Sequence, residues 1–135
     1  MFLTLLLQKS TMKEHFGFEK LSVYKSARQL VKEIFTLQKK FPPEEKYALG
    51  DQLRRSSVSI VANLAEGGGR FSAKEKVHFV EISYGSLLEA YSELQLACDF
   101  GYISENELIN ISSQFDETAK MLSGLRNSLI KSSKL

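Results

Sequence analysis

The stretch QLRRSSVSIVANLAEGGGR, residues 52–70, decides the fold of this chain. It has the spacing of an α-helix that runs into three consecutive glycines. On a 3.6-residue period its apolar side chains form two rows. The rows are Leu53, Ile60 and Leu64, and Val58, Val61 and Ala65. A helix with two apolar rows has two faces to bury, so we expect it to sit inside an assembly of helices.

A third line of side chains runs between these rows and is polar. We call it the polar seam, and it consists of Gln52, Arg55, Ser59, Asn63, Glu66 and Arg70. Polar groups in an apolar helix cost stability unless each finds a partner. The spacing predicts pairing of Glu66 with Arg70 and of Asp51 with Arg55, while Asn63 and Ser59 reach nearby backbone groups. We interpret the seam as structural in preference to a ligand site.

Length and composition predict one soluble domain. The chain has 135 residues, of which 43% are apolar and 25% charged, and this suffices for one core. A single cysteine excludes an internal disulfide and fits a reducing cytoplasm. No stretch has the roughly 18 apolar residues of a membrane span. The apolar run 2–7 is too short for an export signal, and Met12 is a candidate alternative start.

Start and stop signals divide the chain into four helices. The first covers residues 20–40 and ends at Pro42 and Pro43. Pro43 also opens the second, in which Gly50 predicts a bend. The third begins after Ser72, three residues before a glutamate, and stops at Gly101. The fourth repeats this capping pattern at residues 104–107.

Each of the other three helices carries an apolar stripe at steps of three and four residues. The stripes are Val23, Ala27, Leu30, Ile34, Leu37 and Phe41; Val77, Val80, Tyr84, Leu87, Tyr91, Leu94 and Cys98; and Leu108, Ile111, Phe115, Thr118, Leu122, Leu125 and Leu129. Short connections make consecutive helices antiparallel neighbours. We therefore predict an all-α, antiparallel up-down-up-down four-helix bundle over residues 18–130, with a poorly ordered extension 1–17 and a tail 131–135.

The core of the predicted bundle does not bury all apolar side chains of these helices. Phe79, Ile82 and Leu88 fall off the main stripe of their helix, and residues 52–70 carry a second apolar row. Because a bundle of four helices needs one stripe from each, the surplus predicts a protein interface and a homo-oligomer.

Several side chains are candidates for catalytic or metal-binding roles. Glu75 and His78 have the Glu-x-x-His spacing of one ligand pair of a di-iron four-helix bundle. Such a site needs two of these pairs, and His15 is the only other histidine in the sequence, so we predict no metal site. Cys98 is interpreted as a packed hydrophobe, and residues 67–70 as a tight turn in preference to an anion cradle. Serines 56, 57 and 59 lack a nearby base and are interpreted as allowing close helix approach. We predict no enzyme, no cofactor and no small-molecule substrate.

The net charge of +2 is distributed unevenly. Residues 1–70 hold 12 basic and 7 acidic residues, residues 71–117 hold 2 and 9, and residues 118–135 hold 4 and 0. The favoured interpretation is that basic and acidic helices lie side by side. The alternative is a basic surface for phosphate. Its candidate residues are Lys25, Arg28, Lys32, Lys39, Lys40, Arg54 and Arg55.

Several short runs resemble a known family. They are Phe18-Glu19-Lys20-Leu21 with Val23-Tyr24, Phe41-Pro42, Gln52-Leu53-Arg54-Arg55, Ser59-Ile60, Asn63-Leu64-Ala65-Glu66-Gly67, Arg70, and Gly85-Ser86-Leu87 with Glu89. From about Phe18 to Leu125 the chain is similar to the bacterial four-helix-bundle proteins named for 23S rRNA intervening sequences. Val61 departs from that family, which often has proline there.

The resemblance implies a four-helix bundle that assembles as a ring-shaped homopentamer, with no established biochemical activity. It also implies a link to accessory proteins of diversity-generating retroelements, in which a basic pentamer engages nucleic acid. Two functions remain open. One is an oligomeric accessory protein that binds RNA or DNA or associates with the ribosome, and the other is a structural or protein-interaction bundle. The resemblance favours the first.

Overall fold

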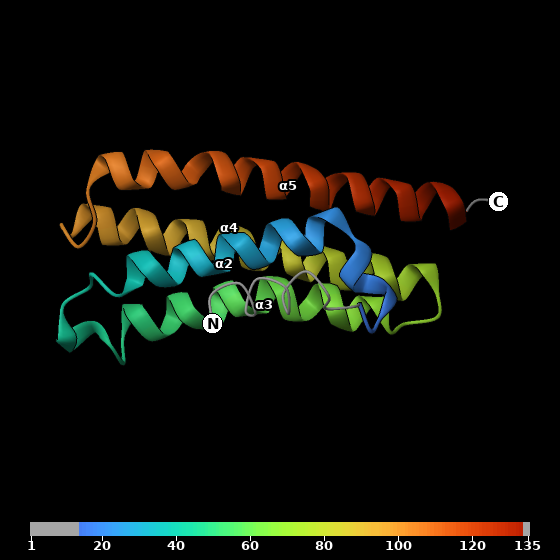
Figure 1. The fold of residues 1–135 in the computed structure, drawn as a ribbon, viewed down its shortest axis with the longest axis horizontal. Helices are drawn as coiled ribbons and strands as arrows, with labels where there is room; N and C mark the ends of the chain where they lie inside the picture. The colour runs from blue at the N-terminus through green and yellow to red at the C-terminus, as the bar shows by residue number, and fades with distance from the viewer. Residues whose placement is uncertain (1–13, 134–135) are drawn as a thin grey trace, which may run out of the picture.

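The chain folds as four long antiparallel helices. The structure is a computed structural model and describes residues 14–133. Its elements in chain order are the 3-10 helix η1 (Gly17–Lys20), α2 (Ser22–Gln38), the 3-10 helix η2 (Pro43–Glu45), α3 (Leu49–Gly68), α4 (Ala73–Asp99) and α5 (Glu105–Ser133). Figure 1 shows α2 to α5 side by side, with the chain reversing direction at each connection. This confirms the predicted all-α, up-down-up-down bundle.

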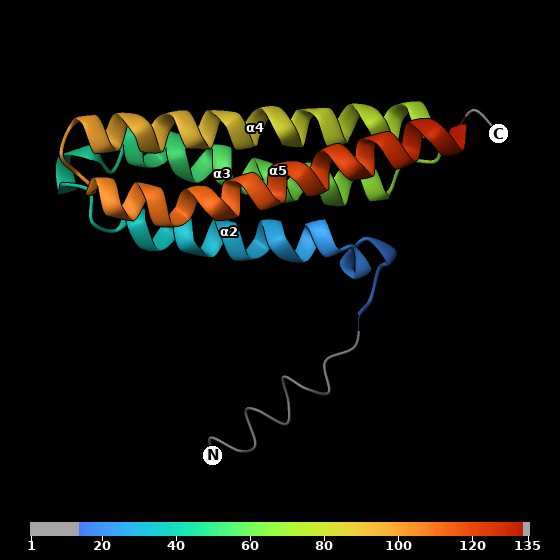
Figure 2. The same cartoon turned by 90° about the horizontal axis from the view of Figure 1, so that it is seen from above.

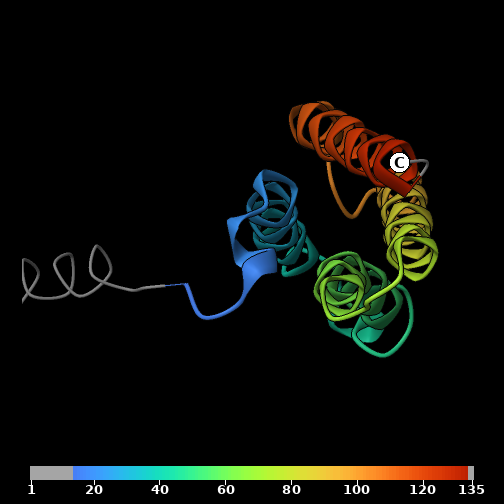
Figure 3. The ribbon, with the colours of Figure 1, turned by 90° about the vertical axis from the view of Figure 1, so that its right-hand side faces the viewer.

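The four helices surround one core. Helix α3 contacts α2 and α4, and α5 closes the ring by contacting α4 and α2. The end-on view in Figure 3 shows this order, and Figure 2 shows that α5 is inclined to its neighbours. The buried residues of the predicted rows are Val23, Ala27, Leu30, Ile34, Phe41, Leu53, Ile60, Leu64, Val80, Leu87, Leu94, Ile111, Phe115, Thr118 and Leu122.

The second apolar row of α3 is partly buried against the core and partly exposed. Val61 is half-buried and packs against the core cluster. Val58, in contrast, is 47% exposed. Among the off-stripe residues of α4, Phe79 is half-buried, whereas Ile82 is 36% and Leu88 is 53% exposed. The outer surface of α3 and α4 therefore keeps exposed aliphatic side chains.

The predicted helix stops lie close to the observed ones. Gly101 has φ +80, a left-handed conformation that favours glycine. There the Tyr102 N–H bonds the Ala97 carbonyl at 2.8 Å and the Gly101 N–H bonds the Cys98 carbonyl at 3.0 Å. These two bonds are the Schellman pattern that closes α4. The capping pattern at the start of α5 is complete, because the Ser104 hydroxyl accepts from the Glu107 N–H and the Glu107 carboxylate accepts from the Ser104 N–H.

The start of the second long helix differs from the prediction. Residues 43–45 form the separate turn η2, and α3 begins only at Leu49. The Glu45 carboxylate accepts a hydrogen bond from the Leu49 N–H, at the start of α3, at 3.1 Å. Gly50 is buried, and a Cβ there would lie 2.8 Å from the Glu45 carbonyl oxygen. The glycine thus permits close approach of the preceding turn, and the chain bends just before it.

Helix η1 packs on α2 and α3. Its residue Phe18 stacks edge-on with Tyr24, with ring centroids 5.0 Å apart. Together with the facing ends of α3, α4 and α5, η1 lines an apolar cavity of about 430 Å³. The apolar run 2–7, Met12 and most of the predicted extension lie outside the described residues, as does the end of the predicted tail.

Candidate functional site

Helix α2 presents a row of cations to solvent. Lys25, Arg28 and Lys32 of α2 and Lys39, the C-cap residue that follows it, are all exposed, and their spacing places them on one side of the helix. At 1.5 Å per residue the row is about 21 Å long. We call these four residues the α2 basic face. Lys25 lies 3.5 Å from the Glu14 carboxylate, whereas the other three have no ion pair with any described residue.

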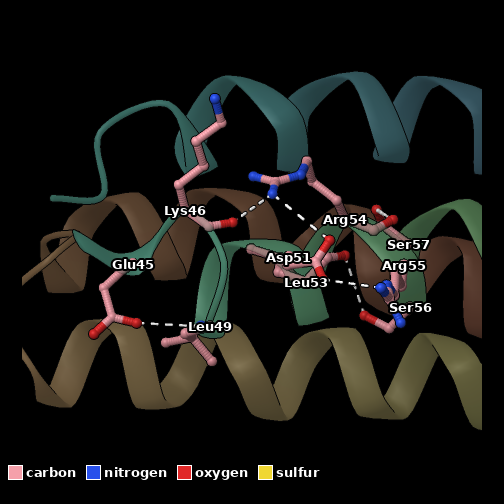
Figure 4. A network of polar contacts seen from close by, with 9 residues as sticks. All are labelled: Glu45, Lys46, Leu49, Asp51, Leu53, Arg54, Arg55, Ser56 and Ser57. Atoms are coloured by element: carbon pink, nitrogen blue, oxygen red, sulfur yellow. Dashed lines mark hydrogen bonds and ion pairs between the residues drawn. The ribbon is translucent and has the colours of Figure 1, made fainter. Parts of the chain in front are cut away.

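The remaining three candidate cations lie elsewhere. Lys40 pairs with Glu107 of α5, and this bond together with the Ser104 N–H lowers the pKa of Glu107. Arg54 donates to the Lys46 carbonyl at 2.6 Å and lies 3.7 Å from Asp51. Arg55 pairs with the other oxygen of Asp51 at 3.2 Å, as Figure 4 shows. The structure therefore divides the seven predicted cations into a row on α2 and three residues that are already paired.

The polar seam of α3 faces α4. The Ser59 and Ser86 hydroxyls lie 2.8 Å apart across the two helices. Asn63 donates to the Ser59 carbonyl at 2.8 Å and to its hydroxyl at 2.9 Å. Near the end of the helix, Arg70 and Glu66 pair at 2.6 Å. The predicted Glu66–Arg70 and Asp51–Arg55 pairs are present, and Asn63 reaches a backbone carbonyl as predicted. The Ser59 hydroxyl instead bonds Asn63 and, across the interface, Ser86, and among the described residues it has no backbone partner.

Small side chains allow α3 and α4 to approach closely. Ser83 of α4 is fully buried, and its hydroxyl donates to the Ile60 carbonyl of α3 at 2.7 Å. Ser57 is also fully buried, and its hydroxyl donates to the Arg54 carbonyl of its own helix. A Cβ at Gly67 would lie 3.0 Å from the Cβ of Phe79. These contacts agree with the interpretation of the serines of residues 52–70 as packing residues.

Sequence reasoning missed a buried carboxylate in this interface. Glu93 of α4 is 7% exposed, and the Ser56 hydroxyl donates to its Oε1 at 2.5 Å. Burial raises the pKa of Glu93, the Ser56 hydrogen bond opposes this shift, and the charge of Glu89 adds to it. Leu94 belongs to the apolar stripe of its helix, and Glu93 lies beside that stripe. An acidic residue in this position is expected to face solvent. The available signal was the four-residue spacing of Glu89 and Glu93, which places both on the side of α4 that faces the seam.

Replacing Glu93 by glutamine is expected to raise the melting temperature at pH 7 by a few degrees. The raised pKa means that ionised Glu93 weakens folding, and this penalty is absent below the ordinary carboxyl pKa and appears as pH rises through the raised value. Glutamine keeps an acceptor for Ser56 and carries no charge. Thermal melts at pH 4 and pH 7 measure this, and a variant less stable than the parent at pH 7 would contradict it.

The other predicted sites have structural explanations. Among residues 14–133, no group of three or more His, Cys, Asp and Glu side chains is arranged to hold a metal ion. His78 is exposed beside Phe79, and Cys98 is partly buried against the core. Gly67 and Gly68 belong to the last turn of α3, so the helix continues two residues into the predicted tight turn. Their carbonyl oxygens each lie 3.4 Å from the Lys76 ammonium. A turn that offers carbonyls attracts cations, so it is no anion cradle.

No helix in the described part of the chain is long and apolar enough to cross a membrane.

Comparisons with known proteins agree with this architecture. One solved structure, described as a protein with unknown function from the S23 ribosomal protein family of Bacteroides thetaiotaomicron VPI-5482, superposes with a TM-score of 0.72 at 24% identity. The match covers 78% of this chain and 95% of that one, and at this identity it shows the fold alone. A search of curated proteins returned no match. The family model of the 23S rRNA-intervening sequence proteins matches residues 19–124. That match covers most of the chain, and the protein therefore belongs to the 23S rRNA-intervening sequence protein family.

Proposed function

We propose that the protein is a non-enzymatic, homo-oligomeric bundle that contacts the phosphates of RNA or DNA through the α2 basic face. One observation carries this proposal. Arg28, Lys32 and Lys39 share one exposed side of α2, and no carboxylate among the described residues pairs with them. Unpaired cations in a row favour a polyanion, and their Coulomb attraction is independent of base sequence.

Binding through this face has no strong sequence preference. Base recognition requires side chains that reach base edges in a groove or aromatic rings on which bases stack. Among residues 14–133, the one aromatic ring that contacts a cation of the face is Tyr24, which lies under Arg28 at 5.8 Å. Lysine and arginine contacts to phosphate position a nucleic acid and carry no sequence information.

Neutralising the α2 basic face is expected to weaken RNA binding by about tenfold or more at 50 mM salt. The variant replaces Arg28, Lys32 and Lys39 by glutamine. Fluorescence anisotropy with one duplex RNA and one single-stranded RNA measures the change in Kd.

The matched control replaces three exposed lysines on other helices, and these are Lys74, Lys120 and Lys131. It keeps the same net charge as the α2 variant. The proposal requires the control to bind much more tightly than the α2 variant. Equal binding by the two variants, or no binding by the parent protein, would contradict it.

The proposed self-association rests on the exposed aliphatic residues of α3 and α4. Val58, Ile82 and Leu88 lie on the outer surface, where a monomer gains nothing from them. Burial of about 25 cal/mol per Å² would make their contact with a second copy favourable. The family resemblance implies five copies in a ring. Such a ring would repeat the α2 basic face and raise the affinity for a long polyanion by avidity.

Light scattering at micromolar concentration is expected to give a multiple of the monomer mass of 15.3 kDa, with five copies as the expected number. Leu88→Glu should lower the mass, because a charge buried without a partner opposes association. A parent protein that scatters as a monomer would refute the oligomer. The matched control is Ile109→Glu on α5, which should leave the mass unchanged.

A structural or protein-interaction bundle is the second candidate function. The groove between α3 and α4 favours it, because Glu89 and Glu93 make that surface acidic and repel phosphate. If the protein forms an oligomer but binds neither RNA nor DNA detectably, the second candidate function is the correct one.

A further inference from the structure

An apolar cavity opens at the end of the bundle where α3 stops and α4 starts. Its volume is about 430 Å³, and Figure 1 shows η1 lying at the same end. The walls come from η1, α3, α4 and α5, and they include Phe18, Leu64, Val80, Leu125 and Leu129. A cavity of about 150 Å³ is large enough for a ring the size of benzene. This cavity therefore has room for more than one apolar side chain.

The cavity carries almost no charge. Among the described residues that line it, Lys76 is the only charged one. The Lys76 ammonium lies 3.4 Å from the carbonyl oxygens of Gly67 and Gly68, so its charge is directed to the C-terminal end of α3. Apolar walls in contact with water cost free energy, which an apolar occupant recovers. The lining thus favours an uncharged, apolar occupant.

The chain before η1 is held beside this cavity. The backbone N–H groups of His15 and Phe16 donate to the Glu19 carboxylate at 2.7 and 2.6 Å. Phe16 lines the cavity and remains 68% exposed, and its ring stacks on that of Phe18 with the centroids 6.0 Å apart. The described part of the chain begins at Glu14, two residues before Phe16. Residues 1–13 therefore join the fold at the wall of the cavity.

The sequence before Glu14 contains an apolar run of suitable composition. Residues 2–7 read FLTLLL, and residues 1–8 contain no charged side chain. Residues 8–13, which read QKSTMK, separate this run from Glu14. At about 3.3–3.6 Å per residue, these six residues span up to about 20 Å, which is enough for the run to return to the cavity. A flexible tether of this length gives an effective concentration in the millimolar range.

We propose that residues 2–7 of the same copy fill this cavity and pack against Phe16 and the ends of α3, α4 and α5. The apolar side chains of the run leave water together with the walls of the cavity, and no charged side chain of the run is buried. The occupant is part of the chain itself, so the contact depends neither on the α2 basic face nor on RNA. It covers the apolar end of the bundle, and a chain that begins at Met12 lacks it.

Disulfide trapping in the whole 135-residue chain tests the position of the run. In a Cys98→Ala background, Leu5→Cys is combined with Ala65→Cys at a residue that lines the cavity. We expect mild oxidation to form a disulfide within one chain, so that the protein loses both thiols and migrates as a monomer on a non-reducing denaturing gel.

The matched control combines Leu5→Cys with Ser113→Cys. Ser113 is exposed on α5 and lies about 18 Å along that helix from Leu125. This pair should oxidise at least about tenfold more slowly than the pair at the cavity. Equal oxidation of the two pairs, or no disulfide with Ala65→Cys, would overturn the proposal. Dimers linked through Ala65→Cys would also overturn it, because they would place the run of a second copy in the cavity.

An apolar fluorescent probe, 1-anilinonaphthalene-8-sulfonate, tests whether the run closes the cavity. The parent is compared with a variant that combines Leu3→Ser and Leu6→Ser, and the matched control combines Gln8→Ser and Thr11→Ser outside the run. If the run occupies the cavity in about nine of ten molecules, the apparent Kd of the probe should be about tenfold lower in the leucine variant than in the other two proteins.

Equal Kd values for the probe in all three proteins would contradict closure of the cavity by the run. A fall in the control as large as that in the leucine variant would contradict it as well. All three proteins keep the α2 basic face, so their RNA binding should be the same. Failure of this proposal is therefore distinguishable from failure of the proposed nucleic-acid contacts.

Discussion

Replacing Ile60 by alanine is expected to lower the free energy of unfolding by about 2–5 kcal/mol. Ile60 is 0% exposed and lies in the core on α3. The substitution removes buried methyl groups and leaves a cavity that four packed helices close only in part. Since total stability of a domain is about 5–15 kcal/mol, the variant should unfold at much lower urea concentration.

Urea titration followed by circular dichroism measures this loss. The matched control is Ile109→Ala, the same chemical change on α5 at a residue that is 65% exposed. It should change the free energy by less than about 0.5 kcal/mol. Both must be measured at one protein concentration, because association adds to apparent stability. Similar losses in the two variants would mean that Ile60 is not in the core.

Ser83→Leu should be as damaging, because it forces α3 and α4 apart. The Ser83 hydroxyl is fully buried and donates to the Ile60 carbonyl at 2.7 Å, so a leucine there must displace the backbone of α3. Overpacking of this kind costs about 1–3 kcal/mol or more. Separation of the helices would also break the Ser59–Ser86 contact. We expect a lower melting temperature. We also expect a smaller oligomer, because separating α3 from α4 distorts the surface proposed for self-association.

Ser83→Ala distinguishes loss of the hydrogen bond from overpacking as the cause of the destabilisation. It deletes the hydrogen bond without adding volume, so the loss should be about 1 kcal/mol. Ser123→Leu places the same large side chain at an exposed position of α5 and should be nearly neutral. A Ser83→Leu protein as stable as the parent would show that α3 and α4 are less tightly packed than described.

The helices were predictable because each apolar stripe has one period over its whole length. Leu30 and Ile34 of α2, for example, are buried as the spacing requires. Gly101 and the capping pattern at Ser104 are local signals, and local signals specify helix ends without tertiary information.

The break before α3 was less predictable because its cause is a contact between segments. Pro43 followed by two glutamates has the pattern of a helix start, and it does form a turn, η2. The Glu45 side chain then satisfies the Leu49 N–H and starts a new helix. Tyr102, from the connection between α4 and α5, donates to the same carboxylate at 2.8 Å. That tertiary hydrogen bond has no signature near residue 45.

The candidate site was predictable only in part. The prediction grouped seven cations in one basic surface, whereas the structure places Lys25, Arg28, Lys32 and Lys39 on one exposed side and the other three elsewhere. Arg54 and Arg55 are neighbours in sequence, but a step of about 100° along the helix directs Arg54 to Lys46 and Arg55 to the α3–α4 groove. Glu93 was missed because burial of an acid depends on the facing helix, here on Ser56 of α3.

The most direct test of the proposed function is the salt dependence of RNA binding. For the parent protein, log Kobs should fall linearly with log salt, with a slope of about −0.9 per phosphate contact on duplex or −0.7 on single strands. In the variant that neutralises Arg28, Lys32 and Lys39, the slope should shrink by about one contact for each residue removed. The control that neutralises Lys74, Lys120 and Lys131 should keep the parent slope. A slope that is equal in all three proteins would contradict phosphate binding by the α2 basic face.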